Sequence, residues 1–478
     1  MKGEILHVAI LNRKVYITTR LLLRKTPAGF FILAMAVAVF LFPARSARAR
    51  TIHVPADSAT IQAGLDGALA GDTVLVADGV YTGEGNKNLD FLGKTVVLTS
   101  EHGPEVTIID CQGSGRGFYF HTFENSYAKV EGFGIIGGHG SPGGGIYLTG
   151  SSSPTISRCI ITANEAWPTG GGIYCGNSSP IISNCNISGN TANSSDEVAA
   201  WGGGIYISER SNPLIVNCII FGNRVRFFPP GDGSALGGGV YCDGSAEFIN
   251  CNIYGNFSTS DAGGIYCQYA ASTFTNCIVW ENQGTEIEAL EGSPVVEYSA
   301  IQGDWPGEGN IDEDPRLRDP HLDNFHLMAV DCGDPFDSPC IDAGDPNIFD
   351  DSLDCWHGLG TSRSDMGAYG GANAGWPTAV EGENSEAEFV PKDFALFQNY
   401  PNPFNSETVL RFRLAGHEFV NIIIYNILGQ QLKVLVEEYR PTGKHSVAWD
   451  ASGFPSGIYF ARLEAGEHSQ TVKMVLLR

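Results

Sequence analysis

A short pattern recurs five times in the middle of this 478-residue chain and strongly limits how the chain can fold. Each copy begins with two glycines, an Ile or Val and a Tyr; the first glycines are Gly144, Gly171, Gly203, Gly238 and Gly263. A segment with one cysteine follows, and these are Cys159, Cys185, Cys218, Cys251 and Cys277, at steps of 26, 33, 33 and 26 residues. The extra residues of the longer steps always follow a Gly-Asn turn, and variable loops at one corner of a constant rung are typical of stacked repeats.

Each repeat predicts two or three short strands and no helix, because its apolar residues alternate between turns rich in glycine and asparagine. One repeat cannot bury its own apolar face, so it must stack on its neighbours. A propeller blade needs about 40 residues or more, which is longer than these steps. The sequence therefore predicts an all-β chain built around a parallel β-helix.

Strand alternation places the repeated cysteines in two inward-facing columns. One column reads Leu148, Cys175, Ile207, Cys242, Cys267, and the other reads Cys159, Cys185, Cys218, Cys251, Cys277, Ser299. Cysteine exchanges with Leu and Ile in the first column, as a small apolar residue does. We therefore interpret the columns as reduced core residues, with disulfides between neighbouring rungs or a metal site as the alternatives. The cysteines most open to oxidation are Cys332, Cys340 and Cys355, outside the columns.

The repeats resemble right-handed parallel β-helix proteins of the pectin-lyase-like type. The stretch TIHVPADSATIQAGLDGALAGDTVLVADGVYTG at 51–83 is similar to the N-terminal region of that family, where a short amphipathic helix covers the first rung. The stretches DEDPRLRDPHLDNFHL, SPCIDAGDP and SDMGAYGG resemble the segment that closes such domains in bacterial surface proteins. The resemblance implies one β-helix domain over residues 50–375, with a cap and a closing segment.

Residues 1–49 have the pattern of a signal peptide. A basic stretch precedes the apolar run from Ala28 to Phe42, which is short for a membrane span, and 47–49 form a small-x-small cleavage site. An uncleaved anchor is the alternative, and no later segment is predicted to span a membrane. Without residues 1–49 the chain has 21 Lys and Arg against 52 Asp and Glu, a formal charge of −31. This charge argues against nucleic acid or an anionic membrane surface as a partner.

The C-terminal part is predicted to be a separate domain. Residues 376–392 are acidic and poor in aliphatic side chains, which indicates a linker. Residues 393–478 contain about seven short alternating segments, typical of a small Ig-like β-sandwich. This part resembles the type A C-terminal sorting domain of type IX secretion, on the basis of Asn399, Pro401, Asn402, Pro403, Phe404, Asn405, Gly457, Lys473 and Arg478. The resemblance implies the type IX secretion machinery as a partner and release from, or attachment to, a bacterial cell surface; a sandwich that simply stays on the protein is the alternative.

An outward column of tyrosines is the candidate ligand-binding site. Its members occupy one register on five successive rungs and are Tyr147, Tyr174, Tyr206, Tyr241 and Tyr266. An exposed aromatic stripe on a flat sheet suits the apolar faces of sugar rings. The alternative is that the tyrosines reflect β-propensity and pack on one another or under the long loops.

No catalytic set of residues can be assembled from the sequence. Gly138-His139-Gly140 is similar to a Gly-His-Gly motif of polygalacturonases, but the paired carboxylates that glycosidases need do not accompany it. Arg158, Arg224 and Arg226 do not stand over a column of aspartates, as lyase chemistry would require. The acidic segments 304–323 and 331–354 make Ca²⁺ a possible ligand, although neither forms an Asp-x-Asp-x-Asp-Gly loop. No other cofactor or metal is predicted.

The sequence therefore predicts an exported, non-enzymatic β-helix protein that binds a polysaccharide or cell-surface glycan or acts as an adhesive or structural rod. A polysaccharide lyase or glycoside hydrolase, acting on a chain that could be acidic, is the alternative function, since the fold alone does not decide between the two.

Overall fold

The computed structural model describes residues 10–11, 14–15, 49–195, 199–228, 234–320, 323–351, 353–355 and 359–371, and, of the C-terminal part, 395–396, 399, 404, 407–414, 418–427, 429–440, 443–466 and 468–476. The chain divides into two compact units, residues 1–380 and 381–478. The predicted linker lies outside the described residues. So does the predicted signal peptide, except for Ala49 and two short paired strands, β1 (Ile10–Leu11) and β2 (Lys14–Val15). Within the ranges just given, no helix is long and apolar enough to cross a membrane.

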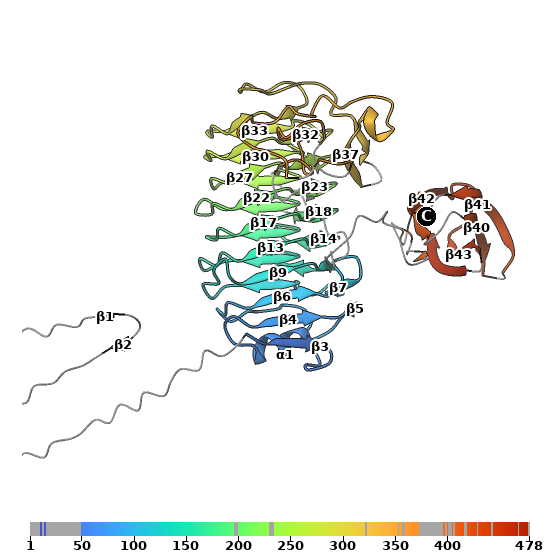
Figure 1. The fold of residues 1–478 in the computed structure, drawn as a ribbon, viewed down its shortest axis with the longest axis horizontal. Coiled ribbons are helices and arrows are strands. Elements are labelled where there is room, and N and C mark those ends of the chain that lie inside the picture. Colours follow the sequence, from blue (N-terminus) through green and yellow to red (C-terminus); the bar gives the residue numbers. More distant parts are fainter. Residues whose placement is uncertain are drawn as a thin grey trace, which may run out of the picture. The chain divides into compact units, whose positions relative to one another are not determined.

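The first unit is a coil of stacked rungs, with each rung contributing strands to long parallel sheets (Figure 1). Sheet 1 contains β3 (Thr51–Val54), β4 (Thr73–Val76), β6 (Val97–Ser100), β9 (Lys129–Glu131), β13 (Thr155–Ser157), β17 (Ile181–Ser183), β22 (Leu214–Val216), β27 (Glu247–Ile249), β31 (Thr273–Thr275) and β34 (Val295–Glu297). Sheet 2 contains β5 (Gly79–Tyr81), β7 (Thr107–Asp110), β10 (Gly134–Ile136), β14 (Ile160–Thr162), β18 (Asn186–Ser188), β23 (Ile219–Phe221), β28 (Asn252–Tyr254), β32 (Ile278–Trp280) and β35 (Ala300–Ile301). Sheet 3 contains β8 (Phe118–Phe120), β12 (Ile146–Leu148), β16 (Ile173–Cys175), β21 (Ile205–Ile207), β26 (Val240–Cys242), β30 (Ile265–Gln268) and β33 (Ile287–Leu290).

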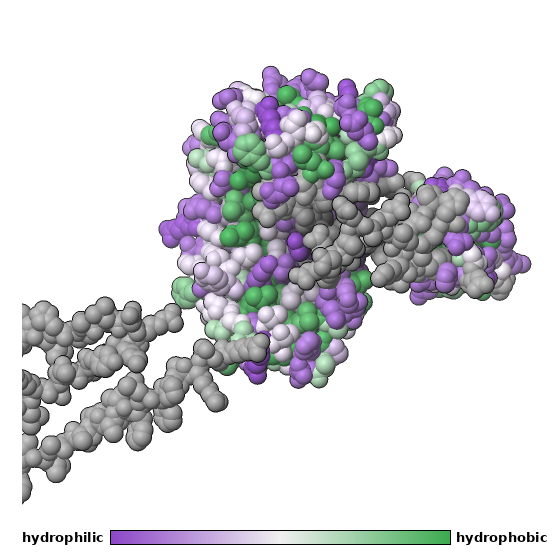
Figure 2. Space-filling view, in the orientation of Figure 1, coloured by the Kyte–Doolittle hydropathy of each residue, from purple (hydrophilic) through white to green (hydrophobic). Residues whose placement is uncertain are grey.

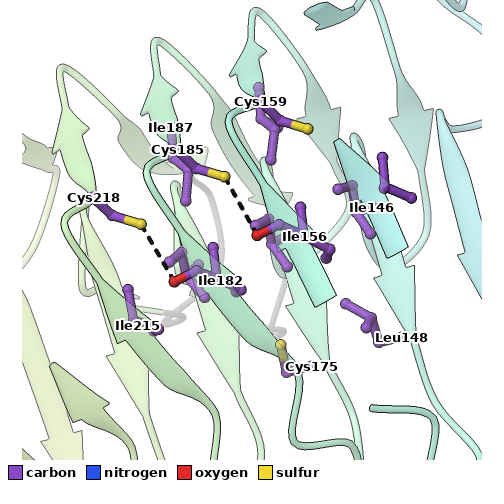
Figure 3. Close-up of a cluster of buried hydrophobic side chains, with 14 of the residues drawn as sticks. Ile146, Leu148, Ile156, Cys159, Cys175, Ile182, Cys185, Ile187, Ile215 and Cys218 are labelled. Atoms are coloured by element: carbon purple, nitrogen blue, oxygen red, sulfur yellow. Dashed lines mark hydrogen bonds between the residues drawn. The ribbon is translucent and has the colours of Figure 1, made fainter. Parts of the chain in front are cut away.

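The two cysteine columns lie inside the coil, as predicted. Register pairs Leu148 with Cys175 and Cys242 with Cys267, and the side chains of both columns are fully buried. In the second column the thiol of Cys185 donates to the carbonyl of Ile156 at 3.7 Å, and that of Cys218 to Ile182 at 3.6 Å (Figure 3). Cys251 and Cys277 donate in the same way to the preceding rung, at 3.5 and 3.7 Å, and the cysteines of both columns are reduced core residues.

A buried column of asparagines, which the repeat pattern alone did not indicate, runs along one corner of the coil. Its members are Asn164, Asn190, Asn223, Asn256 and Asn282. After Asn164, the Oδ1 atom of each member accepts two hydrogen bonds from the preceding one, as Asn223 does from the backbone nitrogen and Nδ2 of Asn190, both at 3.0 Å. On the last rung the carboxylate of Glu286 replaces an asparagine and accepts both bonds of Asn282, and burial raises the pKa of Glu286 to about 7.

The N-terminal end of the coil is covered by a short helix, as the family resemblance implied. Helix α1 (Ile61–Gly67) begins at Thr60, whose Oγ1 accepts a hydrogen bond from Ala63 N at 3.2 Å. The helix buries Ile61 and Leu65 in the coil core, and Gly64 lies so close to Val74 that a Cβ atom would be 3.0 Å from it. It thereby covers the open end of the core.

The residues inserted into the longer repeats build a side lobe on the coil. Sheet 4 of this lobe contains β11 (His139–Gly140), β15 (Glu165–Ala166), β19 (Thr191–Ser195), β24 (Arg224–Phe228) and β29 (Phe257–Ser258). A second small sheet pairs β20 (Ala200–Trp201) with β25 (Ala235–Leu236). Ala192, Ala200, Val225 and Ala235 form a small core between the two, so the described residues of the two long loops pack together beside the rungs.

The closing segment, residues 312–371, folds back over the outer face of sheet 2. It contains the antiparallel pair β36 (Leu317–Asp319) and β37 (Asn324–Leu327) and the short 3-10 helix η2 (Val330–Cys332). Its apolar side chains pack in one cluster with the outward residues Ile219, Tyr254 and Ile278. Cys332 forms a disulfide with Cys355, which confirms that oxidation occurs outside the columns, whereas Cys340 is buried and reduced.

Asp350 in this segment makes the stability of the unit depend on pH. Its Oδ1 accepts a hydrogen bond from Gly371 N, its Oδ2 has no hydrogen-bond partner among the described residues, and burial raises its pKa from 3.8 to about 6. Because the folded state holds this proton more tightly than the unfolded state, stability contributed by the neutral acid is complete below pH 4 and is lost as the pH rises towards 6. We expect Asp350→Asn, which places a neutral amide at this position, to remove the loss of stability that Asp350 causes between pH 4 and 6. The measurement is the thermal midpoint as a function of pH, and an unchanged slope between pH 4 and 6 would show that Asp350 is not the cause.

The second unit is a small antiparallel β-sandwich, as predicted. One sheet contains β38 (Ala395–Leu396), β39 (Glu407–Leu414) and β42 (Gly443–Asp450), and the other contains β40 (Glu418–Asn426), β41 (Gln431–Arg440), β43 (Gly457–Ala465) and β44 (His468–Leu476). Trp449 is fully buried in the core between them, together with Leu410, Ile422 and Leu463.

Candidate functional site

The outward tyrosines form a continuous ladder on sheet 3. Register places the five predicted residues side by side, and the structure adds Tyr119 on β8 as a sixth. From Tyr119 to Tyr266, the centroids of successive rings are 5.3, 5.0, 5.0, 5.3 and 5.5 Å apart. The sequence could have indicated Tyr119, because Phe118-Tyr119-Phe120 has the same alternation as Ile146-Tyr147-Leu148.

The prediction that all five tyrosines are exposed was wrong for two of them. Tyr147, Tyr174 and Tyr206 are half-buried, but Tyr241 is 3% exposed and Tyr266 is 7% exposed. The side lobe covers this end of the ladder, because Trp201 and Leu236 pack on Tyr241 and its neighbours. The alternative, that tyrosines pack under the long loops, is correct at these rungs.

The rings also present a different surface from the one expected. Rings of Tyr174 and Tyr206 are stacked at an angle of 8°, and those of Tyr206 and Tyr241 at 9°. Since each ring covers a face of the next, the open part of the ladder offers ring edges and phenol hydroxyl groups rather than free aromatic faces. Burial raises the pKa of Tyr206 to about 12, with neighbouring Tyr174 adding to the effect, so this hydroxyl remains a hydrogen-bond donor at neutral pH.

The first rungs of the ladder carry basic and aromatic neighbours. The guanidinium carbon of Arg116 lies 4.6 Å from the ring centroid of Tyr147 and 5.4 Å from that of Tyr119. His121 stacks on Tyr119 with 4.1 Å between centroids, and its Nε2 is 3.1 Å from Asp90 Oδ2. The side lobe contributes Trp201 near Tyr206, at 6.2 Å between centroids, so the ladder has an aromatic boundary along the covered rungs.

His139, in the Gly-His-Gly sequence, lies on the first strand of sheet 4 and not on the ladder. Its Nδ1 is 3.9 Å from the carboxylate of Glu165 on the next strand. Arg158 lies on another side of the coil, 3.7 Å from Glu131, which Lys129 also contacts at 2.9 Å. The structure therefore brings together one histidine and one carboxylate, but it does not join them to Arg158.

The acidic closing segment does not gather its carboxylates into an ion site in the part of it that the structure describes. Across all described residues, no group of three or more His, Cys, Asp or Glu side chains is close enough to hold a metal ion. The carboxylate of Asp365 instead accepts backbone hydrogen bonds from Asp342 and Leu359 at 2.8 and 2.7 Å, and burial raises its pKa to about 8. Asp365 therefore organises the segment's own backbone.

Several of the predicted sorting residues lie in or against the core of the second unit. Asn399 Nδ2 donates to Thr408 Oγ1 at 2.8 Å, and the buried ring of Phe404 contacts that of Trp449 at 5.4 Å between centroids. Gly457 begins β43, and Lys473 lies on β44. Pro401, Asn402, Pro403, Asn405 and Arg478 lie outside the described residues.

The visible face of the coil is mixed in polarity. Figure 2 shows hydrophobic and hydrophilic residues interspersed over the visible face of the coil. A hollow of about 450 Å³ lies beside the last rung, between Glu286 and Trp305. The ladder rather than a deep cavity is therefore the most regular array of functional groups on the described part of the unit.

Comparison with known proteins agrees with both units. Residues 94–293 match the family described as "Right handed beta helix region", and residues 398–477 match "Secretion system C-terminal sorting domain". No curated protein matches the chain in sequence. A solved structure, that of the pectate lyase Pel9A, aligns with 67% of this chain and 96% of its own, at 13% identity and a TM-score of 0.35. Residues 94–293 are therefore a right-handed parallel β-helix and residues 398–477 a type IX secretion sorting domain, which directs the protein to the surface of a bacterium or to the medium.

Proposed function

We propose that the β-helix is a non-enzymatic glycan-binding unit, delivered outside the cell by its sorting domain. The observation that supports this proposal is the open part of the ladder. There the half-buried residues Tyr147, Tyr174 and Tyr206 place their phenol groups in a row, with one group on each rung. A row of fixed, regularly spaced hydroxyls suits an extended polymer whose own hydroxyls repeat along the chain.

The chemistry of the row favours hydrogen bonding to sugar hydroxyls over stacking on sugar faces. A phenol is both a donor and an acceptor, as a sugar hydroxyl is. The rings hold one another in place, so little side-chain freedom remains to be lost when a ligand binds. This is the main difference from an isolated exposed tyrosine.

The overall charge favours a neutral glycan. The chain carries a formal charge of −24, which would repel an anionic polysaccharide at long range. Arg116 is a basic residue at the ladder, but it lies over the first two rungs, at Tyr119 and Tyr147. We expect neutral chains to bind along Tyr147 to Tyr206 and acidic chains to bind less tightly.

The test is glycan-array binding by the triple variant Tyr147→Phe, Tyr174→Phe and Tyr206→Phe. These changes keep the stacked rings and remove only the hydroxyls. Three lost hydrogen bonds, at about 0.5–1.5 kcal/mol each, predict at least a tenfold loss of affinity. Tyr127→Phe, at a tyrosine that is 78% exposed and off the ladder, is the matched control and should not change binding.

Two results would count against this function. Unchanged binding by the triple variant would remove the ladder from the site. Turnover of a bound polysaccharide by the unmodified protein would favour the lyase or hydrolase instead, and reaction products from a panel of neutral and uronic-acid polysaccharides would reveal it.

A further inference from the structure

The outward face of sheet 4 carries a second set of polar and aromatic groups that the ladder does not use. Ala192 and Val225 point into the side lobe and are buried in its core. Alternate residues point outward, and register places Glu165 next to Thr191, and Asn193 next to Arg226. This face is therefore separate from the core of the lobe and from sheet 3.

The carboxylate of Glu165 is held in place by two donors. Its Oε1 accepts a hydrogen bond from Trp167 Nε1 at 3.2 Å and another from Asn193 Nδ2 at 2.7 Å. Its Oε2 has His139 Nδ1 at 3.9 Å. One acceptor oxygen is thus engaged within the protein, and the other faces a group with which it makes no close hydrogen bond.

Asn193 lies beneath this face and leaves one acceptor unused. The residue is only 7% exposed, and its Oδ1 is buried with no hydrogen-bond partner among the described residues. An unsatisfied buried polar atom costs about 1–3 kcal/mol, and its presence in a native fold calls for an explanation. The neighbouring Arg226 is half-buried and forms no ion pair with a carboxylate of any described residue.

Two aromatic rings lie beside these polar groups. The rings of Trp167 and Phe228 are loosely stacked, with centroids 6.4 Å apart and planes inclined by 23°, so they form one apolar patch. Phe228 is 43% exposed, and Trp167 is partly exposed. We name Trp167, Phe228, Glu165, Asn193 and Arg226 together the side-lobe platform.

We infer that the side-lobe platform binds one pyranose unit of a neutral glycan, an inference that rests on the proposed function and gives it a second contact point. The apolar face of the sugar packs on Trp167 and Phe228. Arg226, which is half-buried, donates to a sugar oxygen. The fixed carboxylate of Glu165 accepts from another hydroxyl and disfavours a uronate in the same place.

The experiment compares the full-length protein with variants of the platform on an array of neutral and acidic glycans, followed by titration of the tightest neutral oligosaccharide. Trp167→Ala is expected to weaken that binding about tenfold or more, and Phe228→Ser about threefold or more. Phe123→Ser, at a phenylalanine that is 74% exposed elsewhere on the coil, is the matched control. Thermal midpoints identify any variant that fails to fold, and Phe228→Ser, at an exposed ring, keeps the test decisive if Trp167→Ala does so.

The outcomes separate this inference from the proposed function. If the platform variants bind like the unmodified protein while the triple ladder variant loses affinity, the platform is not a site and the proposed function stands. Preferential binding of uronic-acid glycans by the unmodified protein would overturn the neutral ligand class. Absence of glycan binding by the unmodified protein would overturn both.

Discussion

Replacing Asn223 with alanine is expected to lower the free energy of unfolding of the β-helix by about 3–5 kcal/mol. The side chain donates from Nδ2 to Ile187 O at 2.8 Å and to Asn256 Oδ1 at 3.0 Å, and its Oδ1 accepts from the backbone nitrogen and Nδ2 of Asn190. Alanine leaves partners on both neighbouring rungs unsatisfied in a site that excludes water. Because each rung contacts only its neighbours, the lost hydrogen bonds should weaken the contacts between the rung of Asn223 and the two rungs beside it, in the middle of the coil.

The measurement is urea unfolding followed by far-UV circular dichroism. Asn212→Ala is the matched control, because the side chain of Asn212 is exposed, and we expect it to change stability by no more than about 0.5 kcal/mol. Equal effects of the two substitutions would mean that the buried asparagine column contributes nothing specific.

Gly171→Ala is the second substitution with a large expected effect, about 3 kcal/mol or more. A Cβ atom on Gly171 would lie 2.4 Å from the carbonyl oxygen of Gly203 and 2.6 Å from that of Thr191. Both are backbone atoms of stacked rungs, so neither can move without separating the rungs. The double glycine before each Ile-Tyr pair is thus required by close approach of the backbone.

Gly222→Ala distinguishes this steric effect from backbone strain. Gly222 has a φ angle of +61°, but a Cβ atom added to it would have no neighbouring atom within 4 Å. Replacing it with alanine should lower the free energy of unfolding by about 1–2 kcal/mol, which is the penalty for a left-handed backbone conformation at a residue with a Cβ atom. If thermal or urea unfolding of Gly171→Ala shows no greater loss than that of Gly222→Ala, close packing of carbonyls is not the reason for the glycine.

Much of the coil could be predicted because its repeats align themselves. The spacing of Cys159 to Cys277 fixes the register, and period-two alternation then assigns each neighbour to the inside or outside. Cys175 and Cys185 were assigned correctly on this basis. The disulfide could be placed only among Cys332, Cys340 and Cys355, because pairing there depends on how a segment without repeats folds.

The candidate site could be predicted only in part. The register of Tyr241 and Tyr266 was correct, but their burial depends on Trp201 and Leu236, which lie in or next to inserted segments that vary in length. The orientation of the rings depends on packing between rungs, which alternation does not describe. The unsatisfied oxygen of Asn193 likewise depends on the tertiary position of Glu165, to which the Asn193 amide donates.

The contacts of the closing segment limit how this repeat array can change length. Asn217 Nδ2 donates to Gly370 O at 2.7 Å, Asn250 Nδ2 donates to Asp365 O at 2.8 Å, and Asn276 Oδ1 accepts from Asp345 N at 2.6 Å. The closing segment is therefore bonded at fixed positions to three successive rungs. Duplication or deletion of a repeat between 217 and 276 would change the spacing of these three asparagines, so the segment could no longer form all three hydrogen bonds. A change before residue 184 would leave all three bonds in place. Insertions of whole repeats in related chains should accordingly gather towards the N-terminal half of the coil.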